Sequence, residues 1–263
     1  MNVSKLISAG LFSLFWAAGA AGAADAVIPG ADAVEYTTPS GWTFNVALYG
    51  WLAGLEGDVG VRGRTAHVDA SFSDVLEDLD IGVMGFAEAR YERFGVFTDL
   101  NYVKLSTSSD TPFGVLASSA DFTTHSLMWT AAGEYRLLDQ PDASLDAFAG
   151  FRLFSIENEL NFNPPGLLGG LDLSQTETWA DPIVGLKGNV ALSPQFYLTS
   201  WAMIGGGASS DIVWDLMGGG GYWFTESFSV FLGYRAAGVD YENDGFVYDV
   251  VQHGPILGAV FRF

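Results

Sequence analysis

The chain has 263 residues and a formal net charge of −20 at pH 7, from 31 acidic and 11 basic residues. This balance argues against nucleic acid as a partner. Cysteine is absent, which excludes a disulfide scaffold, thiolate catalysis and cysteine-based metal sites. Aromatic residues make up 14% of the chain, so it is not a disordered acidic polypeptide.

Residues 1–23 have the pattern of a cleaved signal peptide. Lys5 precedes an apolar stretch over residues 6–18, and Ala21-Gly22-Ala23 supplies the small residues of a cleavage site. The stretch is shorter than the ~20 apolar residues that a membrane-spanning helix needs. The sequence therefore predicts export, followed by a short periplasmic segment over residues 24–40.

Beyond residue 40, apolar and polar residues alternate with a period of two, as in strands with one apolar face. Ile81 to Tyr91 is an example, since its odd positions are mostly apolar and its even positions include Glu88 and Arg90. These runs exceed the length usual in soluble sheets, and short and long connections alternate between them. We expect ten strands, at residues 42–54, 81–93, 95–106, 121–137, 144–158, 176–192, 195–206, 211–223, 227–241 and 246–263.

The predicted fold class is all-β: a single antiparallel transmembrane β-barrel over residues 41–263, with short periplasmic turns and longer extracellular loops. Eight or twelve strands stay open as alternatives, because the first long loop has room for a further hairpin at Val59 to Val68. In the same loop, Ser71 and Asp74 have the spacing of a capping box, which predicts one short helical turn.

Charged residues within the strands fall on the face opposite the apolar one. A lysine or arginine facing lipid at the midplane costs ~2–4 kcal/mol, so we expect these charges to line the lumen. The set contains six acids and six bases, which can neutralise one another across the barrel. The predicted lumen-lining charges are Glu88, Arg90, Asp99, Glu134, Arg136, Asp146, Arg152, Asp181, Lys187, Asp215, Arg235 and Arg262.

Aromatic residues near the expected strand ends predict two interfacial girdles. The periplasmic girdle would contain Trp42, Tyr91, Phe94, Tyr135, Phe196, Tyr222 and Phe228, and the outer one Trp51, Tyr102, Trp179 and Trp214.

The last ten residues carry the most specific pattern. Phe261 and Phe263 share an apolar face with the alternate residues before them, and this strand resembles the C-terminal strand of Gram-negative outer-membrane proteins. The resemblance implies that the two phenylalanines are the signal read by the barrel assembly machinery. Phe246, Tyr248 and Val250 have the opposite parity, and a bulge near Gly254-Pro255 would return them to the lipid face.

Residues 68–76 (VDASFSDVL) and 245–250 (GFVYDV) resemble an uncharacterised family of alphaproteobacterial outer-membrane proteins, and the whole chain resembles small OmpA-like and OmpW-like barrels. This resemblance implies an integral protein of the bacterial outer membrane, with outer-membrane lipids and lipopolysaccharide as partners. It implies no activity.

The sequence offers few candidates for chemistry. His125 and Ser126, with Asp121 nearby, could imitate the base and nucleophile of an outer-membrane hydrolase. No catalytic partner is recognised in the sequence for His67 or His253. Residues 240–245 resemble the start of a calcium-binding loop but lack its final glutamate. We therefore expect no catalytic residue, no metal site and no cofactor, while weak divalent cation binding by the acidic loops stays open.

Three functions remain. The function that the sequence favours is a narrow passive channel for small solutes or small apolar molecules, in which Met84, Phe86, Phe148 and Phe154 are expected to narrow or block the lumen. The second is a structural or surface-interaction barrel with a closed lumen and acidic extracellular loops. The third, an outer-membrane lipid hydrolase or protease near His125, is an alternative to our expectation that the protein is not an enzyme.

Overall fold

The structure, a computed structural model, describes residues 41–61, 63–110, 119–163 and 172–263. The predicted signal peptide (1–23) and periplasmic segment (24–40) lie outside these residues. Among the described residues, no helix has the length and apolar character needed to cross a membrane.

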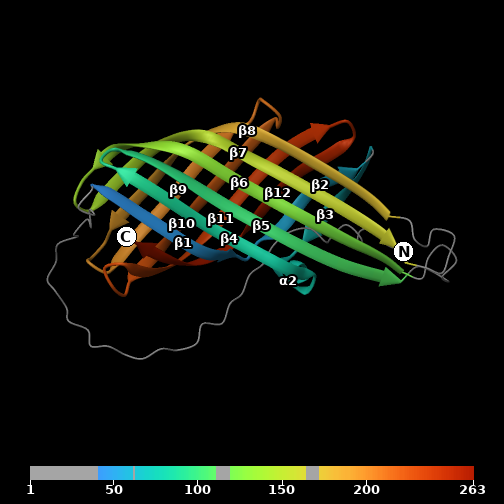
Figure 1. Cartoon of the computed structure of the whole chain (residues 1–263), viewed down its shortest axis with the longest axis horizontal. Coiled ribbons are helices and arrows are strands. Elements are labelled where there is room, and N and C mark those ends of the chain that lie inside the picture. Colours follow the sequence, from blue (N-terminus) through green and yellow to red (C-terminus); the bar gives the residue numbers. More distant parts are fainter. Residues whose placement is uncertain (1–40, 62, 111–118, 164–171) are drawn as a thin grey trace.

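Ten strands form a closed antiparallel barrel (Figure 1). Each pairs with the next along the chain, and the last pairs with the first, so the wall closes on itself. The ten predicted strands are confirmed, with boundaries that differ by a few residues. They are β1 (Trp42–Trp51), β4 (Leu79–Tyr91), β5 (Phe94–Asp110), β6 (Ser119–Asp139), β7 (Ala143–Phe162), β8 (Asp172–Ala191), β9 (Phe196–Gly205), β10 (Ile212–Trp223), β11 (Phe228–Asn243) and β12 (Phe246–Arg262).

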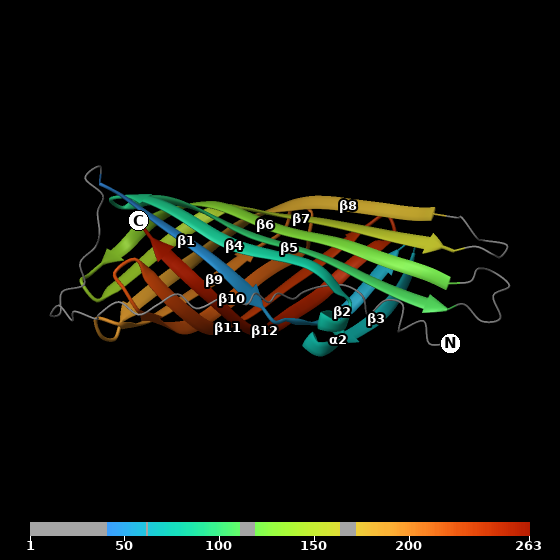
Figure 2. The ribbon, with the colours of Figure 1, turned by 60° about the horizontal axis from the view of Figure 1, so that its bottom comes forward.

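The two ends of the barrel differ in their connections. At one end, here called the turn end, residues 92–93, 140–142, 192–195 and 224–227 join consecutive strands, and the chain finishes at Phe263. The opposite end is called the loop end. There the long strands β5 to β8 project beyond their neighbours (Figure 2). One side of the wall therefore stands taller than the other.

Two extra strands, β2 (Gly54–Val61) and β3 (Arg64–Ala70), form a hairpin that pairs with the first half of β12. The hairpin that the sequence left open is thus present, although it lies beside the closed ring of ten strands. The short helix α2 (Phe72–Glu77) follows, with Ser71 as its N-cap and both halves of the predicted capping box formed. Hydrogen bonds from the Ser71 hydroxyl and backbone N–H lower the pKa of Asp74.

Strand β12 changes partner at Gly254 and Pro255. Its second half pairs with β1, and its first half pairs with β2, while its pairing with β11 runs without interruption. The predicted bulge is therefore wrong.

Phe246, Tyr248 and Val250 point into the barrel, where all three are buried. The reason is that the interior at the loop end is a packed apolar core, so an apolar side chain there needs no return to the lipid face.

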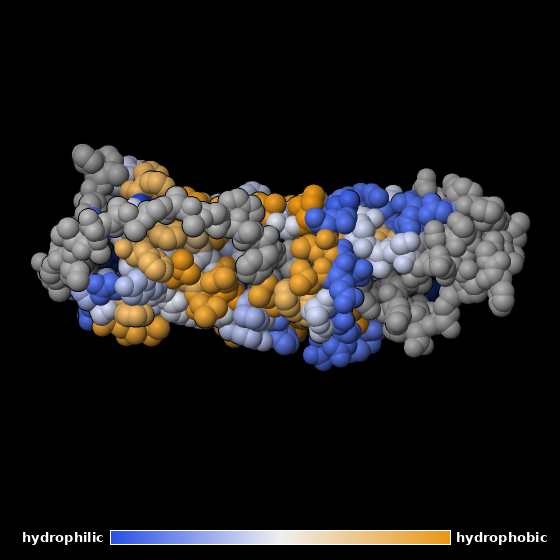
Figure 3. Space-filling view, turned by 90° about the horizontal axis from the view of Figure 1, so that it is seen from below, coloured by the Kyte–Doolittle hydropathy of each residue, from blue (hydrophilic) through white to orange (hydrophobic). Residues whose placement is uncertain are grey.

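The outward face carries a broad apolar belt that ends toward the loop end (Figure 3). At the turn end, aromatic rings touch around the rim, as Trp42 does with Tyr91 and Phe94 with Tyr135. The predicted outer girdle is wrong for two of its members, because Trp51 and Trp179 are buried inside the barrel. Hydropathy identifies an apolar position but does not tell lipid from a packed interior.

Candidate functional site

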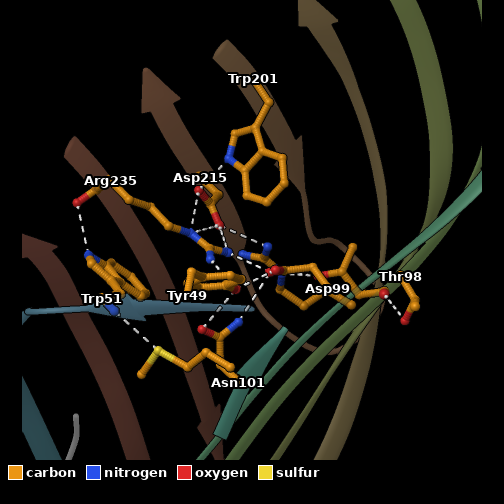
Figure 4. Close-up of polar contacts among 11 residues, drawn as sticks. Tyr49, Trp51, Thr98, Asp99, Asn101, Trp201, Asp215 and Arg235 are labelled. Atoms are coloured by element: carbon orange, nitrogen blue, oxygen red, sulfur yellow. Dashed lines mark hydrogen bonds and ion pairs between the residues drawn. The ribbon is translucent and has the colours of Figure 1, made fainter. Parts of the chain in front are cut away.

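A network of charged side chains crosses the middle of the barrel, with Arg235 of β11 at its centre (Figure 4). Its guanidinium group donates to Asp215 of β10 and to Asp99 of β5, each at 2.8 Å. A further N–H donates to the Tyr49 hydroxyl of β1 at 3.0 Å, and that hydroxyl in turn donates to Asp99. Because β5 and β11 are not neighbours in the sheet, the Arg235–Asp99 contact spans the lumen.

A second arginine balances the charge of this central network. Arg152 of β7 donates to Asp215 at 2.8 Å and to Thr130 at 2.8 Å, so two carboxylates face two guanidinium groups. The relative exposed surface of Arg152, Asp215 and Arg235 is 0%, and that of Asp99 is 1%. These four side chains are thus almost completely removed from solvent.

Two tryptophans pack over the central arginine. The guanidinium carbon of Arg235 lies 4.7 Å from the Trp51 ring centre and 4.8 Å from that of Trp201. Such cation–π contacts strengthen when they are removed from water. The Trp201 indole N–H also donates to Asp215 at 2.9 Å (Figure 4). The rings therefore fill the space beside the ion pairs and orient them.

A second network lies closer to the turn end. Lys187 of β8 contacts Glu88 of β4 and lies 2.7 Å from Glu134 of β6. Arg90 contacts Glu134 and lies 3.0 Å from Asp146 of β7. A third base joins at the rim, because Arg136 donates to Asp146 at 2.9 Å. Three buried acids thus face three bases, and Arg136 also pairs with the exposed Asp139 at 3.3 Å.

Apolar layers lie on both sides of the central network. One is a small cluster between the two networks, and the Lys187 ammonium lies over two of its rings, Phe86 and Phe97, at 5.6 and 5.3 Å. The other fills the loop end, where Trp179 stacks between Phe154 and Tyr241. Charged and apolar layers therefore alternate along the axis and occupy it.

The remaining two predicted lumen charges lie at opposite ends. Asp181 accepts hydrogen bonds from the backbone N–H groups of Ser209 and Ser210 at 2.8 and 2.9 Å, which fixes the turn between β9 and β10. Arg262 lies at the turn end, 4.3 Å over the Trp223 ring.

The uncharged partners of these charges were not among the predicted site residues. Tyr49, Asn101 and Trp201 have the inward parity of their strands, and that parity was the available signal.

The outward face at the loop end is acidic. Asp240, Asp249 and Asp58 lie directly across from one another on β11, β12 and β2, with no base among the three. Subtracting the six acids and six bases of the predicted interior set from the whole chain leaves 25 acidic and 5 basic residues elsewhere. The net charge of the protein thus comes from residues outside this neutral interior set.

Replacing Asp249 by asparagine is expected to stabilise the folded barrel by about 0.5 kcal/mol, because like charges directly opposite one another destabilise a sheet. Urea unfolding followed by tryptophan fluorescence measures the change. The gain should shrink as sodium chloride is added, because these charges are exposed. Asp142→Asn, at the turn end, is the matched control, and an equal gain there would contradict the explanation.

The candidate catalytic residues do not form a dyad. Ser126 is buried on the inward side of β6, whereas His125 is on the outward side, where its Nδ1 lies 3.0 Å from the Tyr102 hydroxyl. His67 pairs with Asp58 at 2.9 Å on the exposed hairpin. Residues 240–243 are the last residues of β11, and residues 244–245 are a two-residue turn with positive φ, so this segment is not a calcium loop.

Comparison with known proteins gives a likeness of fold. No family model matches the chain, and no curated protein matches it. Among solved structures, the outer-membrane protease OmpT from Escherichia coli matches with a TM-score of 0.56 and 10% identity, covering 86% of this chain and 98% of that one.

The translocator domain of the autotransporter NalP from Neisseria meningitidis has a TM-score of 0.46 at 14% identity, with 87% of this chain and 90% of that one covered. At these identities the likeness concerns architecture alone. The chain has the fold of the outer-membrane β-barrels.

Proposed function

We propose that this protein is an integral outer-membrane barrel with a closed lumen, which acts through its acidic loop end at the cell surface. The observation that carries the proposal is the central network, in which Arg235 holds Asp99 and Asp215 from different parts of the wall with no exposed surface. A solute path along the axis would have to break these ion pairs.

The cost of opening such a path supports the closed form. Removing one partner from a buried ion pair costs about 3–5 kcal/mol, and the apolar layers above and below would have to separate as well. Of the three functions left open by the sequence, the packed interior favours the structural or surface-interaction barrel over the narrow channel.

The surface of the barrel supports both the membrane location and the orientation that we propose. The apolar belt and the aromatic rim at the turn end suit a bilayer, and the outer-membrane fold supports the bacterial outer membrane as its location. Phe261 of β12 and Phe263, which directly follows the strand, are exposed, and the barrel assembly machinery could bind them there. The acidic loop end then faces the lipopolysaccharide and the medium, where divalent cations can bridge carboxylates to anionic partners.

The reconstituted barrel is expected to give no single-channel current above that of the bare lipid bilayer, because its axis is filled. Planar bilayers with a high salt concentration on both sides measure this, and liposome swelling tests uncharged solutes. A porin reconstituted in the same lipid is the positive control. Co-flotation with liposomes and heat-modifiable gel mobility establish that the barrel is inserted and folded.

Discrete current steps that scale with the amount of inserted barrel would overturn the closed-lumen proposal in favour of the channel. Swelling with small solutes but no ionic current would do the same.

A further inference from the structure

Three potential metal ligands meet on the outward face of the wall, near the loop end. They are His125 of β6 and Glu157 and Glu159 of β7, and their ligand atoms all lie within 4.8 Å of one another. The strand geometry explains the meeting, because His125 lies directly across from Glu157 and Glu159 follows two residues later on the same face. All three residues are half-buried.

The cluster lies at the upper edge of the apolar belt. Along β6 the outward positions are apolar or aromatic from Tyr135 to Leu127, and His125 is the next one. With a rise of about 3.4 Å per residue and a tilt of about 40°, the ten residues from Tyr135 to His125 span roughly 25 Å, the height of the apolar band of such barrels. His125 therefore lies at the level of the lipid headgroups, where water and ions can reach it.

The nearest base does not neutralise the two glutamates. Lys104 of β5 lies directly across from His125, but its ammonium pairs with Asp80 at 3.2 Å. Among the described residues, neither Glu157 nor Glu159 forms an ion pair with a lysine or an arginine. Two carboxylates on one face of a strand repel each other, and a bound cation would relieve that repulsion.

A contact with Tyr102 orients the His125 ring in a way that suits a metal ligand. Its Nδ1 lies 3.0 Å from the Tyr102 hydroxyl, in a contact between neighbouring strands. A hydrogen bond from Nδ1–H to the tyrosine oxygen leaves the lone pair of Nε2 free. Metal-bound imidazoles have this arrangement, in which the second nitrogen donates to an oxygen of the protein.

We propose that His125, Glu157 and Glu159 bind one Zn²⁺ ion on the outer face of the barrel. One imidazole and two carboxylates with an open fourth position is a donor set that zinc accepts, whereas Mg²⁺ and Ca²⁺ prefer oxygen ligands alone. This site was not expected from the sequence, which predicted no metal ligand. The proposal is independent of whether the lumen is closed.

The test is zinc binding by the full-length folded barrel in detergent, after EDTA treatment and dialysis. Isothermal titration is expected to give one Zn²⁺ per chain, with Ca²⁺ and Mg²⁺ in millimolar excess failing to displace it. His125→Ala and the pair Glu157→Gln with Glu159→Gln should each weaken binding more than about a hundredfold, and Tyr102→Phe about tenfold.

The chain offers a matched control in His253. Its Nδ1 lies 2.7 Å from the Tyr234 hydroxyl on the same outward face, and no cluster of three potential ligands among the described residues includes it. His253→Ala should leave the affinity unchanged. Gel mobility of each variant before and after heating confirms that it is folded.

X-ray absorption of the zinc-loaded barrel should show a shell of nitrogen and oxygen with a single imidazole. No saturable binding, a first shell without imidazole, or a loss of binding in His253→Ala but not in His125→Ala would each overturn the proposal.

Discussion

Replacing Arg235 by alanine is expected to lower the free energy of unfolding by about 3–5 kcal/mol, because it leaves a buried carboxylate without its positively charged partner. Asp215 would keep its ion pair with Arg152, but Asp99 would lose the base that it pairs with among the described residues, because its ion pair is with Arg235. The two tryptophan rings would also face a cavity. Urea unfolding of the detergent-solubilised barrel, followed by circular dichroism, measures the change.

Charge and cavity can be separated by a second variant. Adding Asp99→Asn to Arg235→Ala removes the uncompensated carboxylate and should recover part of the lost stability, although the cavity remains. Arg262→Ala, at the turn-end rim, is the matched control and should cost far less, because Arg262 is only half-buried. If Arg235→Ala lowers the free energy of unfolding no more than Arg262→Ala does, the stabilising role assigned to the central network is contradicted.

The second large effect is expected at Gly254, where β12 changes partner from β1 to β2. A Cβ atom at this position would lie 1.9 Å from the backbone oxygen of Leu52 and 2.9 Å from the Cα of Ala53. Both atoms belong to the backbone, which cannot rotate away as a side chain can. Gly254→Ala is therefore expected to cost about 3 kcal/mol or to prevent closure of the barrel.

Gly133→Ala is the matched control, because a Cβ atom there would meet nothing within 4 Å. The folded fraction of both variants, refolded side by side and separated by gel mobility without heating, measures the difference. If Gly254→Ala folds to the same extent as Gly133→Ala, the backbone between β1 and β2 can shift to make room for the methyl group. The close approach of β12 to this backbone would then not be needed for folding.

Much of the fold followed from the sequence because the governing physics is local. A charge on a strand must avoid hydrocarbon, and the period of two then fixes which residues share its face. Glu88, Asp99, Arg152 and Asp215 could therefore be assigned inward before any contact was known. The Ser71 capping box is local in the same way, since its two partners lie three residues apart.

The candidate sites depended on distances that the sequence does not contain. Arg235 and Asp99 are 136 residues apart, and their contact needs both the strand order and the register around the barrel. The meeting of His125 with Glu157 depends equally on register, and a shift of one residue would place the two side chains on opposite faces.

The sequence by itself determined the all-β class, the ten strands, the charged inward face and the aromatic rim at the turn end. Each follows from a residue's own preference for water or hydrocarbon. The tertiary structure alone decided that Trp51, Trp179 and Phe246 turn inward, that β12 switches partners without a bulge, and that Arg235 meets Asp99 across the lumen. Apolar side chains gain similarly from lipid and from a packed interior, so only the neighbours supplied by the closed wall distinguish the two.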